Sequence, residues 1–540
     1  MGNDNNLRPD SLPAGQTLDP PTDWAYVFFA IVRRDLSVYF RYGSAWMNPL
    51  VFVFVVVSLF AIALAGEGHE VTVIDRDPPP PDLSTDAAFE EWQRRGVGQL
   101  RHSHAFLARL YQLIRENHPA LLADLLEAGC RELKFADTVP MPLVPSYVPE
   151  KGDEHLTILS SRRTTLELIM RRYAARQPDV TFRTDEVVEG LIAEKNADGQ
   201  AVVHGVTLRS GEKVTGDLVV DAMGRLNPGA DWLKELGVHI REEEAPAGIV
   251  YFTRHYRIKQ GMREPERTAA PGAADLGFLK FGVFPGDNGC FSITLAVPEA
   301  ERTLSKAILD TDVFDRICRS IPGLAPWLEE ERTEPRSKVF LMGNLFSRWR
   351  HMTEAGKPHA LNYFPLGDCH IRTNPLYGRG CSFAAIQAHI LRDVLRTEKD
   401  PAVRALAYHT AVNEEIRPYY DNMVKQDLGA IKRARHELTP GYKPGFKARL
   451  VKRFTEDGIN IAIRSDIHLY RAFMQGFHML AHPTAWLLEN KKNLAKVLWI
   501  WARGRRWNRK YYPPRTGPGR TELFNALGLP IDADLITDQA

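Results

Sequence analysis

The hydrophobic and polar positions in the first quarter of the chain follow three patterns in succession. Residues 46–65, WMNPLVFVFVVVSLFAIALA, carry no formally charged side chain, and twenty such residues are long enough to cross a bilayer as a helix. Residues 70–74 then alternate into β-branched side chains until the turn-forming run DPPPPD at 77–82, so we expect a strand there. From residue 86 to 134 apolar residues recur at helical spacing.

The rest of the chain is predicted to pass from strands to helices. Residues 180–221 hold four strand-like segments, VTFRTD, VVEGLIAE, AVVHGVTLRS and DLVVDAMG, which predict an antiparallel meander ending in a buried strand. A second β-rich stretch runs from 249 to about 297, with two strands around a turn at 285–289. After residue 361 a short apolar strand leads through a Pro/Gly turn into a helix, and helices predominate to about residue 505.

Composition narrows the class of protein. The chain has 540 residues and 44% hydrophobic content, which is typical of a globular protein with two or three domains. It has 69 Lys and Arg against 67 Asp and Glu, so its overall charge gives no reason to expect nucleic acid as a partner. The five cysteines show no C-x-x-C spacing, which favours a reducing compartment and predicts no metal site.

The segment before the apolar run indicates a membrane anchor. Arg33, Arg34 and Arg41 precede it, so a spanning helix would keep its N-terminal side in the cytoplasm. No convincing A-x-A cleavage site follows the run, and we therefore expect an uncleaved anchor rather than a signal peptide. Residues 1–23, rich in Asn, Asp, Pro and Gly, are expected to be a disordered lead.

The stretch with the most chemical information is LNYFPLGDCHIRTNPLYGRGCSFAAIQAHILRDVL, residues 361–395. Its strand delivers Asp368 at the carboxyl end, and Gly378 and Gly380 open the helix that follows. A carboxylate in that place can accept hydrogen bonds from a ribityl or ribose hydroxyl. Glycines let free amides at the helix start approach the negative edge of a reduced flavin. The order of elements favours a flavin, and a simple turn before a core helix is the alternative interpretation.

The segment GDCHIRTNPLYGRGCSFAAIQA resembles the GD motif of the aromatic-hydroxylase and epoxidase class of FAD-dependent monooxygenases. The resemblance implies that Asp368 contacts the ribityl or ribose part of the flavin. It also implies that Pro375, Gly378 and Gly380 lie against the isoalloxazine ring. FAD as cofactor and NAD(P)H as electron donor follow from the same likeness.

Two further segments resemble this family in the expected order. HEVTVIDRD is similar to the second strand of the nucleotide-binding fold, which implies that Asp75 accepts the adenosine ribose hydroxyls; a simple turn-forming role is the alternative. DLVVDAMGRLN resembles the second fingerprint through Asp221 and Gly224. Ala222 and Met223 stand where the family more often has Asp-Gly, which puts the docking of NAD(P)H in doubt.

Two basic segments resemble parts of the family that contact the flavin. GVGQLRHSHAFLARL is similar to the segment after the first crossover and implies a contact from Arg101, and SSRRTTLE implies one from Arg163. Arg101, His102 and His104 also invite a catalytic interpretation, whose alternative is a structural or cofactor-adjacent role. No side chain is assigned as a catalytic acid or base.

The glycine-rich phosphate loop of the family is missing at its expected place. Counting back from Gly68, its three glycines would fall where this chain has Phe52, Phe54 and Val57. Bulky side chains there would occupy the space of the diphosphate, so we expect impaired FAD affinity.

The replacing segment has a likeness of its own. Residues 28–64 resemble the start of the B subunit of the cytochrome c-type haem exporter, which implies membrane association through residues 46–65 and a place in the bacterial inner membrane. Without insertion the protein would be cytoplasmic. An anchor with this topology would carry the flavin domain away from cytoplasmic FAD. The second hypothesis is therefore a membrane-anchored, non-catalytic fusion or remnant related to haem export.

We predict an α/β protein with an FAD-binding, Rossmann-like domain of the glutathione-reductase type and an inserted antiparallel β substrate domain, flanked by an N-terminal hydrophobic helix and a helical C-terminal tail. The predicted divisions are a lead at 1–23, apolar helices at 24–66, the FAD-binding domain at 67–245 and 355–400, the substrate domain at 246–354, and the helical region at 401–540. The resemblance implies hydroxylation or epoxidation of an apolar organic substrate by oxygen through a flavin C4a-hydroperoxide. A flavin-dependent reductase of prenyl chains is a further alternative.

Residues 485–512, AWLLENKKNLAKVLWIWARGRRWNRKYY, interleave tryptophans with lysines and arginines. Such a segment can lie on a membrane surface. The alternative is a helix that covers the substrate domain and leaves its basic face in water.

Overall fold

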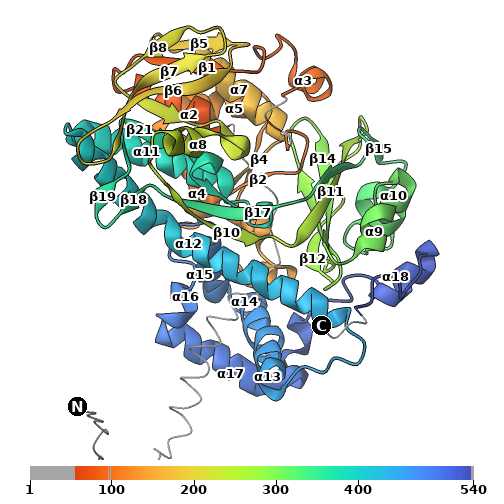
Figure 1. Cartoon of the computed structure of the whole chain (residues 1–540). Coiled ribbons are helices and arrows are strands. Elements are labelled where there is room, and N and C mark those ends of the chain that lie inside the picture. Colours follow the sequence, from red (N-terminus) through yellow and green to blue (C-terminus); the bar gives the residue numbers. More distant parts are fainter. Residues whose placement is uncertain (1–54, 95–96, 98, 537–540) are drawn as a thin grey trace, which may run out of the picture.

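The computed structural model describes residues 55–94, 97 and 99–536 of the chain (Figure 1). Two β-rich regions form one part of the molecule, and helices of the C-terminal region form the other, with the long helix α12 (Pro401–Glu437) between them. Two sets of residues singled out in the sequence lie outside the described residues. They are the lead expected at 1–23 and the arginines Arg33, Arg34 and Arg41.

Two pairs of parallel strands belong to the first β-rich region. β1 (Val71–Asp75) pairs with β5 (Val180–Thr184), and β9 (Val219–Asp221) pairs with β21 (Tyr363–Pro365). Their apolar side chains share buried clusters with the helices α2 (Val55–Ala65), α7 (Arg163–Ala175) and α11 (Gly380–Thr397). β1 lies within one residue of the strand expected at 70–74, so that prediction is confirmed.

α2 and α11 pack against each other and run in the same direction. Glu67, directly after α2, accepts a hydrogen bond from Nε of Arg396 in the last turn of α11, at 2.7 Å. Because the C-terminal ends of the two helices meet, their N-terminal ends also lie toward a common side. That side holds the start of α11, where the sequence places its flavin motif.

The described part of the apolar run is a helix in the protein core, which gives no support to the expected membrane anchor. Leu59 and Ala61 are completely buried, and Phe60 is 6% exposed. Across the described ranges, no helix is both long and apolar enough to cross a membrane. A helix that is apolar on every side fits a protein core as well as a bilayer, so hydropathy alone does not distinguish the two.

The other expectations for the N-terminal segment stay predictions. Residues 46–54 lie outside the described residues, as do Phe52 and Phe54 of the replaced phosphate loop. The backbone of Val57 is helical. Nothing in the described residues supports the likeness to the haem exporter.

Leu59→Ala is expected to lower the free energy of unfolding by about 2–5 kcal/mol, because it removes a buried side chain and leaves a cavity. Urea unfolding of detergent-free protein measures the change. Leu126→Ala is the matched control, since Leu126 is 38% exposed and its loss should cost no more than about 0.5 kcal/mol. Equal, small effects at both positions would contradict the burial of α2.

An antiparallel meander lies between β5 and β9, but it contains only two of the four strands that were predicted for it. β6 (Val188–Lys195), β7 (Ala201–Leu208) and β8 (Lys213–Thr215) form it, and β20 (Ala360–Leu361) adds in parallel beside β7. β5 and β9 were also expected in the meander and instead pair in parallel with β1 and β21. Alternation along a strand reveals the strand but not its partner.

The second β-rich region is one antiparallel sheet whose strand order is β12-β13-β14-β11-β15, with β16 also paired to β11. Its strands are β11 (Ile249–Ile258), β12 (Ala273–Asp275), β13 (Lys280–Pro285), β14 (Cys290–Pro298), β15 (Thr333–Pro335) and β16 (Phe340–Met342). β13 and β14 confirm the two strands predicted around residues 285–289. Helices α9 (Arg302–Ala307), α10 (Thr311–Arg319) and α18 (Arg520–Leu527) share its apolar core.

Short elements connect these regions. The strands are β2 (Ala105–Phe106), β3 (Arg131–Leu133), β4 (Ile158–Ser160), β10 (Arg241–Pro246), β17 (Phe346–His351), β18 (Thr353–Glu354), β19 (Lys357–Pro358) and β22 (Ile371–Arg372). The α-helices are α3 (Thr85–Glu91), α4 (Ala108–Asn117), α5 (Pro119–Glu127), α6 (Phe135–Thr138) and α8 (Gly229–Glu235). Single turns are η1 (Met141–Ser146), η2 (Asp153–Leu156), η3 (Gly224–Leu226), η4 (Ala325–Leu328), η5 (Gly367–Cys369), η6 (Pro375–Tyr377) and η8 (Arg509–Tyr511).

The C-terminal region is helical, which confirms the prediction to about residue 505. Its elements are α13 (Phe446–Phe454), the π-helical turn η7 (Thr455–Ile459), α14 (Asn460–Ser465), α15 (Ile467–Phe477), α16 (Ala485–Leu488) and α17 (Lys491–Asn508). They share one apolar cluster with η1, η2 and α6.

Candidate functional site

Asp368 lies just beyond β21, in the turn η5 that faces the start of α11. Gly367 takes a left-handed conformation, with φ of 62°, which glycine adopts without strain. Its amide donates to Oε1 of Gln387 in α11 at 2.7 Å. Asp368 is 1% exposed, and within the described residues neither of its carboxylate oxygens has a hydrogen-bond partner. Since buried polar groups are normally paired, this carboxyl group indicates a ligand position.

The electrostatic surroundings of Asp368 are those of a buried acid among arginines. Burial raises the pKa of Asp368 to about 8, and the guanidinium groups of Arg372, Arg163 and Arg348 oppose that rise. The carboxyl group is therefore partly protonated near neutral pH, and a hydroxyl donor beside it would favour its charged form.

Other buried polar atoms without hydrogen-bond partners belong to the elements that meet at Asp368. In the part of the chain that the structure describes, they are Nε and Nη2 of Arg163, Nη2 of Arg372, Oγ1 of Thr373 and Oγ of Ser382. Arg163 opens α7, Arg372 ends β22 and Ser382 lies in the first turn of α11. Arg163 and Arg372 act on the Asp368 carboxylate from two of these elements, so unpaired donors accompany an unpaired acceptor, as in a site for a polar molecule.

Arg163 and His104 hold each other in a defined orientation. Arg163 is 1% exposed, and its Nη1 donates to Nε2 of His104 at 3.2 Å. Nδ1 of His104 in turn donates to the carbonyl of His102 at 2.7 Å. One ring nitrogen therefore carries a proton and the other a lone pair. Burial and then Arg163 lower the pKa of His104 well below its ordinary value, so this imidazole is neutral and is not a ready proton donor.

Polar contacts fix the segment that opens α11. Gly378 has φ of 62°, and Pro375 and Gly380 are buried. Asp427 of α12 accepts hydrogen bonds at 2.8 Å from both Asn374 Nδ2 and the Tyr377 hydroxyl. Burial raises the pKa of Asp427 to about 8. Sequence reasoning missed Asp427, since α12 gives no local signal that one of its residues reaches this segment.

Asp75 belongs to a buried ion network that leads toward Asp368. Its Oδ2 lies 3.0 Å from Arg94 Nη2 and 3.4 Å from Arg171 Nη1. Arg94 also pairs with Glu167, whose Oε2 lies 3.5 Å from Nε of Arg163. The acid expected at the adenosine end and Arg163 near Asp368 are therefore joined by one chain of charges. Asp75 Oδ1 also accepts from the Asp77 amide at 3.0 Å, as the turn-forming alternative requires.

Asp221 and Gly224 make hydrogen bonds that hold the turn carrying Asp368 in place. The Asp221 carboxylate accepts hydrogen bonds from Asn227, the Tyr363 hydroxyl and the Met223 amide, the last at 3.0 Å. The amide of Gly224 donates to Sγ of Cys369 at 2.9 Å. These contacts connect β9 and η3 to the turn that carries Asp368, and they occupy both carboxylate oxygens of Asp221.

The guanidinium group of Arg101 makes its hydrogen bonds with the end of α3. It donates to the backbone carbonyls of Phe89, Glu90 and Trp92 at 2.6, 3.1 and 2.9 Å. It thereby satisfies carbonyl groups at the C-terminal end of α3, which a helix leaves without partners. His102 is also used internally, because its Nδ1 lies 3.1 Å from Oγ1 of Thr253 in β11.

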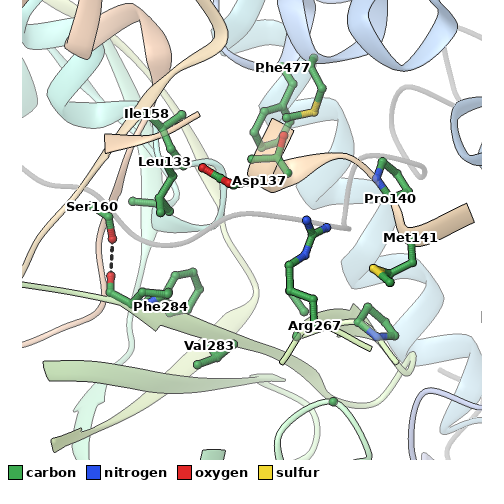
Figure 2. A pocket seen from close by; sticks show the side chains of 18 of the residues that line it. Leu133, Asp137, Pro140, Met141, Ile158, Ser160, Arg267, Val283, Phe284 and Phe477 are labelled. Atoms are coloured by element: carbon green, nitrogen blue, oxygen red, sulfur yellow. Dashed lines mark hydrogen bonds between the residues drawn. The ribbon is translucent and has the colours of Figure 1, made fainter. Parts of the chain in front are cut away.

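A cavity of about 390 Å³ lies between β2 and β4, the β11–β12 loop and helices of the C-terminal region. Figure 2 shows apolar side chains around it, among them Leu133, Ile158 and Phe477, with Arg267 and Asp137 also directed toward the space. This size and lining are typical of small-molecule sites. No sequence motif predicted the cavity, because its walls come from segments that are hundreds of residues apart.

Two buried histidines also line the cavity. His104 lines it and also accepts the hydrogen bond from Arg163, so one side chain connects the cavity with the group around Asp368. His478 lines it as well and is 2% exposed. Among the described residues neither ring nitrogen of His478 has a hydrogen-bond partner. A ligand with a hydroxyl or carbonyl group would satisfy this imidazole.

Comparison with known proteins gives one sequence relative and several similar solved structures. No protein-family model matches the chain. Protein Rv3254 of Mycobacterium tuberculosis is 26% identical over 346 residues, which are 60% of this chain and 68% of that protein.

The similar solved structures include two proteins that are described as FAD- or flavin-dependent. PqsL of Pseudomonas aeruginosa, a probable FAD-dependent monooxygenase, has 13% identity and a TM-score of 0.46, covering 70% of this chain and 97% of its own. The flavin-dependent brominase Bmp2, as a triple mutant, has 14% identity and a TM-score of 0.44 over 88% of this chain and 96% of its own. A 2-methyl-3-hydroxypyridine-5-carboxylic acid oxygenase has 14% identity and a TM-score of 0.43 over 74% and 94% of the respective chains.

Proposed function

We propose that this chain is an FAD-dependent, NAD(P)H-linked oxidoreductase of the monooxygenase class that acts on an apolar small molecule. The carrying observation is the buried Asp368 carboxyl group, which has no hydrogen-bond partner in the described part of the chain and lies where β21 meets the start of α11. A cofactor hydroxyl donating to Asp368 would remove the cost of that unpaired group. The ion network from Asp75 to Arg163 supports a dinucleotide-sized site.

The residues present fit FAD at its sugar and ring ends. Asp368 would accept a ribityl hydroxyl, and Pro375 and Gly378 would lie beside the ring. Free amides at the start of α11, at Gly380, would face the ring edge that becomes negative on reduction. When bound, FAD supplies hydride acceptance from NAD(P)H and activation of oxygen.

The protein's own contribution would be placement and exclusion of water. The cavity offers an apolar substrate a largely apolar lining, and His104 joins that lining to Arg163 near Asp368. A neutral His104 cannot act as a proton donor at neutral pH, so its role would be to orient Arg163 and to shape the cavity wall. We assign no catalytic acid or base.

Titration of FAD into purified protein tests the proposal. We expect saturable quenching of flavin fluorescence with weak affinity, because Phe52, Phe54 and Val57 replace the loop glycines. The flavin-loaded protein should then oxidise NADH or NADPH and consume oxygen. Absence of FAD binding up to about 1 mM, which corresponds to about −4 kcal/mol, would overturn the proposal. NAD(P)H-dependent saturation of a prenyl substrate without oxygen consumption would favour the reductase alternative.

A further inference from the structure

The C-terminal helical region carries an excess of positive charge that the whole chain does not show. Residues 442–512 contain 15 Lys and Arg against 4 Asp and Glu, whereas the rest of the chain contains 54 against 63. The net charge of +2 is therefore the sum of a positive C-terminal helical region and a negative remainder of the chain. A negatively charged surface would attract the positive region and so orient the molecule.

Helix α17 presents much of this charge on one face, together with an exposed tryptophan. Val497 and Ile500 are buried against the rest of the region, and Trp499 between them is 66% exposed. The side chains on its exposed face up to the kink at Gly504 are Lys491, Lys492, Ala495, Lys496, Trp499, Ala502 and Arg503. Alanines lie three or four residues from Trp499 on either side, so the indole projects beyond its neighbours.

Two more aromatic side chains extend this surface. Trp507, after the kink, is 71% exposed, and Phe446 at the start of α13 is 74% exposed. α13 and α17 are joined at their inner sides, where the rings of Phe454 and Trp501 meet edge to face with centroids 5.1 Å apart. Figure 1 shows both helices at one end of the molecule, on the side away from the two β-rich regions.

Most of the charges on this face have no carboxylate partner. Lys496 pairs with Asp466 and Arg505 with Asp457. Lys491, Lys492, Arg503 and Arg506 have no carboxylate oxygen within 4.0 Å among the residues that the structure describes. These four cations are therefore available to an anionic partner.

We propose that residues 442–512 form a docking surface for an anionic lipid bilayer, with Trp499, Trp507 and Phe446 entering the headgroup layer. Indole rings favour that layer because one part is apolar and the N–H is polar. The lysines and arginines beside them are attracted to the negative potential of an anionic lipid surface. A bilayer fits better than a nucleic acid because the aromatic groups project from the outer sides of helices rather than lining a positively charged groove.

The cavity lies near this surface, which suggests what membrane docking could serve. The docking proposal does not depend on the flavin function. Asn460 and Ile463 of α14 line the cavity, and α14 also packs against α17. The docking surface and the cavity therefore lie on the same helical unit. An apolar ligand dissolved in the bilayer would have a short route to the protein.

Sedimentation of the full chain with lipid vesicles tests the docking surface. We expect binding to phosphatidylcholine vesicles that contain phosphatidylglycerol, little binding to pure phosphatidylcholine, and loss of binding at high salt. Trp499→Ala with Trp507→Ala should weaken partitioning at least about tenfold, and Lys492→Glu with Arg503→Glu and Arg506→Glu should abolish the preference for anionic lipid. Leu309→Ala with Lys306→Glu, both exposed on the inserted domain, is the matched control and should bind as wild type.

A second measurement keeps the test independent of variant folding. Tryptophan fluorescence of the wild-type chain should be quenched by lipids brominated on their acyl chains. Absence of vesicle binding would overturn the proposal, as would equal binding to neutral vesicles. Binding of a DNA oligonucleotide in place of vesicles, or dimerisation weakened by the tryptophan substitutions without vesicle binding, would assign the surface to another partner and also overturn it.

Discussion

Asp368→Asn is expected to weaken FAD binding by about 10- to 150-fold, the loss of about 1.5–3 kcal/mol from a hydrogen bond to a charged acceptor. The amide keeps the size of the side chain but not its charge. Equilibrium titration of FAD by fluorescence quenching measures the change. Asp137→Asn, at an exposed residue that lines the cavity, is the control and should leave FAD affinity unchanged. An unchanged affinity in Asp368→Asn would separate this carboxyl group from the cofactor.

The same substitution should have the opposite effect on the flavin-free protein. The pKa of Asp368 is about 8 when folded, against an ordinary value of 3.8, so the folded state binds the proton more tightly than the unfolded state does. Its contribution to stability is complete below the ordinary pKa and is lost as the pH rises through about 8. The variant has no carboxyl group to titrate at this position. Its melting temperature should therefore fall less between pH 5 and 9 than that of the wild type. A steeper decline would contradict the burial of an unpaired carboxyl group.

Arg94→Met is expected to lower the free energy of unfolding by about 3–5 kcal/mol, since removal of one partner strands buried charges. Its guanidinium group is 4% exposed and pairs with Asp75, Asp77 and Glu167, whose side chains are 9%, 3% and 2% exposed. Urea unfolding at neutral pH measures the loss. Arg176→Met is the matched control, because Arg176 pairs with Asp124 at 59% exposure and should cost no more than about 1 kcal/mol.

The Arg94 result also bears on the cofactor site. A loss below about 1 kcal/mol would mean that the three carboxylates find other partners or protons. In that case the ion network would not be the rigid link between Asp75 and Arg163 that the proposed function uses. FAD titration of Arg94→Met, at a urea concentration where the variant is folded, would then show whether the link matters for binding.

Sequence patterns within a few neighbouring residues were enough to predict several strands and helices. β1, the β13–β14 pair and α11 appear where alternation, turn residues and helical spacing placed them. The apolar run was assigned to a bilayer because hydropathy reports the absence of charge and not the identity of the apolar surroundings. In the protein, α7 and α11 provide those surroundings for α2, and no pattern within residues 46–65 encodes that choice.

The candidate site was predictable to the same extent. Asp368 and the glycines that open α11 form a contiguous motif, so their juxtaposition follows from chain connectivity. The partners of Arg94 and the reach of Asp427 to Tyr377 depend on pairs separated by dozens of residues, which one sequence does not reveal. Arg101 shows that a motif does not fix the contacts of a side chain. Its segment resembles one that contacts a flavin, whereas its guanidinium group donates to carbonyls at the end of α3.

The pairing of β9 with β21 joins Val219 to Tyr363, so it closes a loop of about 140 residues that contains the whole six-stranded sheet. Closing a long loop carries an entropic cost that is repaid only when the distant contacts form. The turn that carries Asp368 therefore acquires its surroundings only after the inserted sheet has been synthesised and folded. If the proposed function holds, cofactor binding is a late step in the maturation of the chain, because a polypeptide arrested before residue 363 lacks Asp368 and the start of α11.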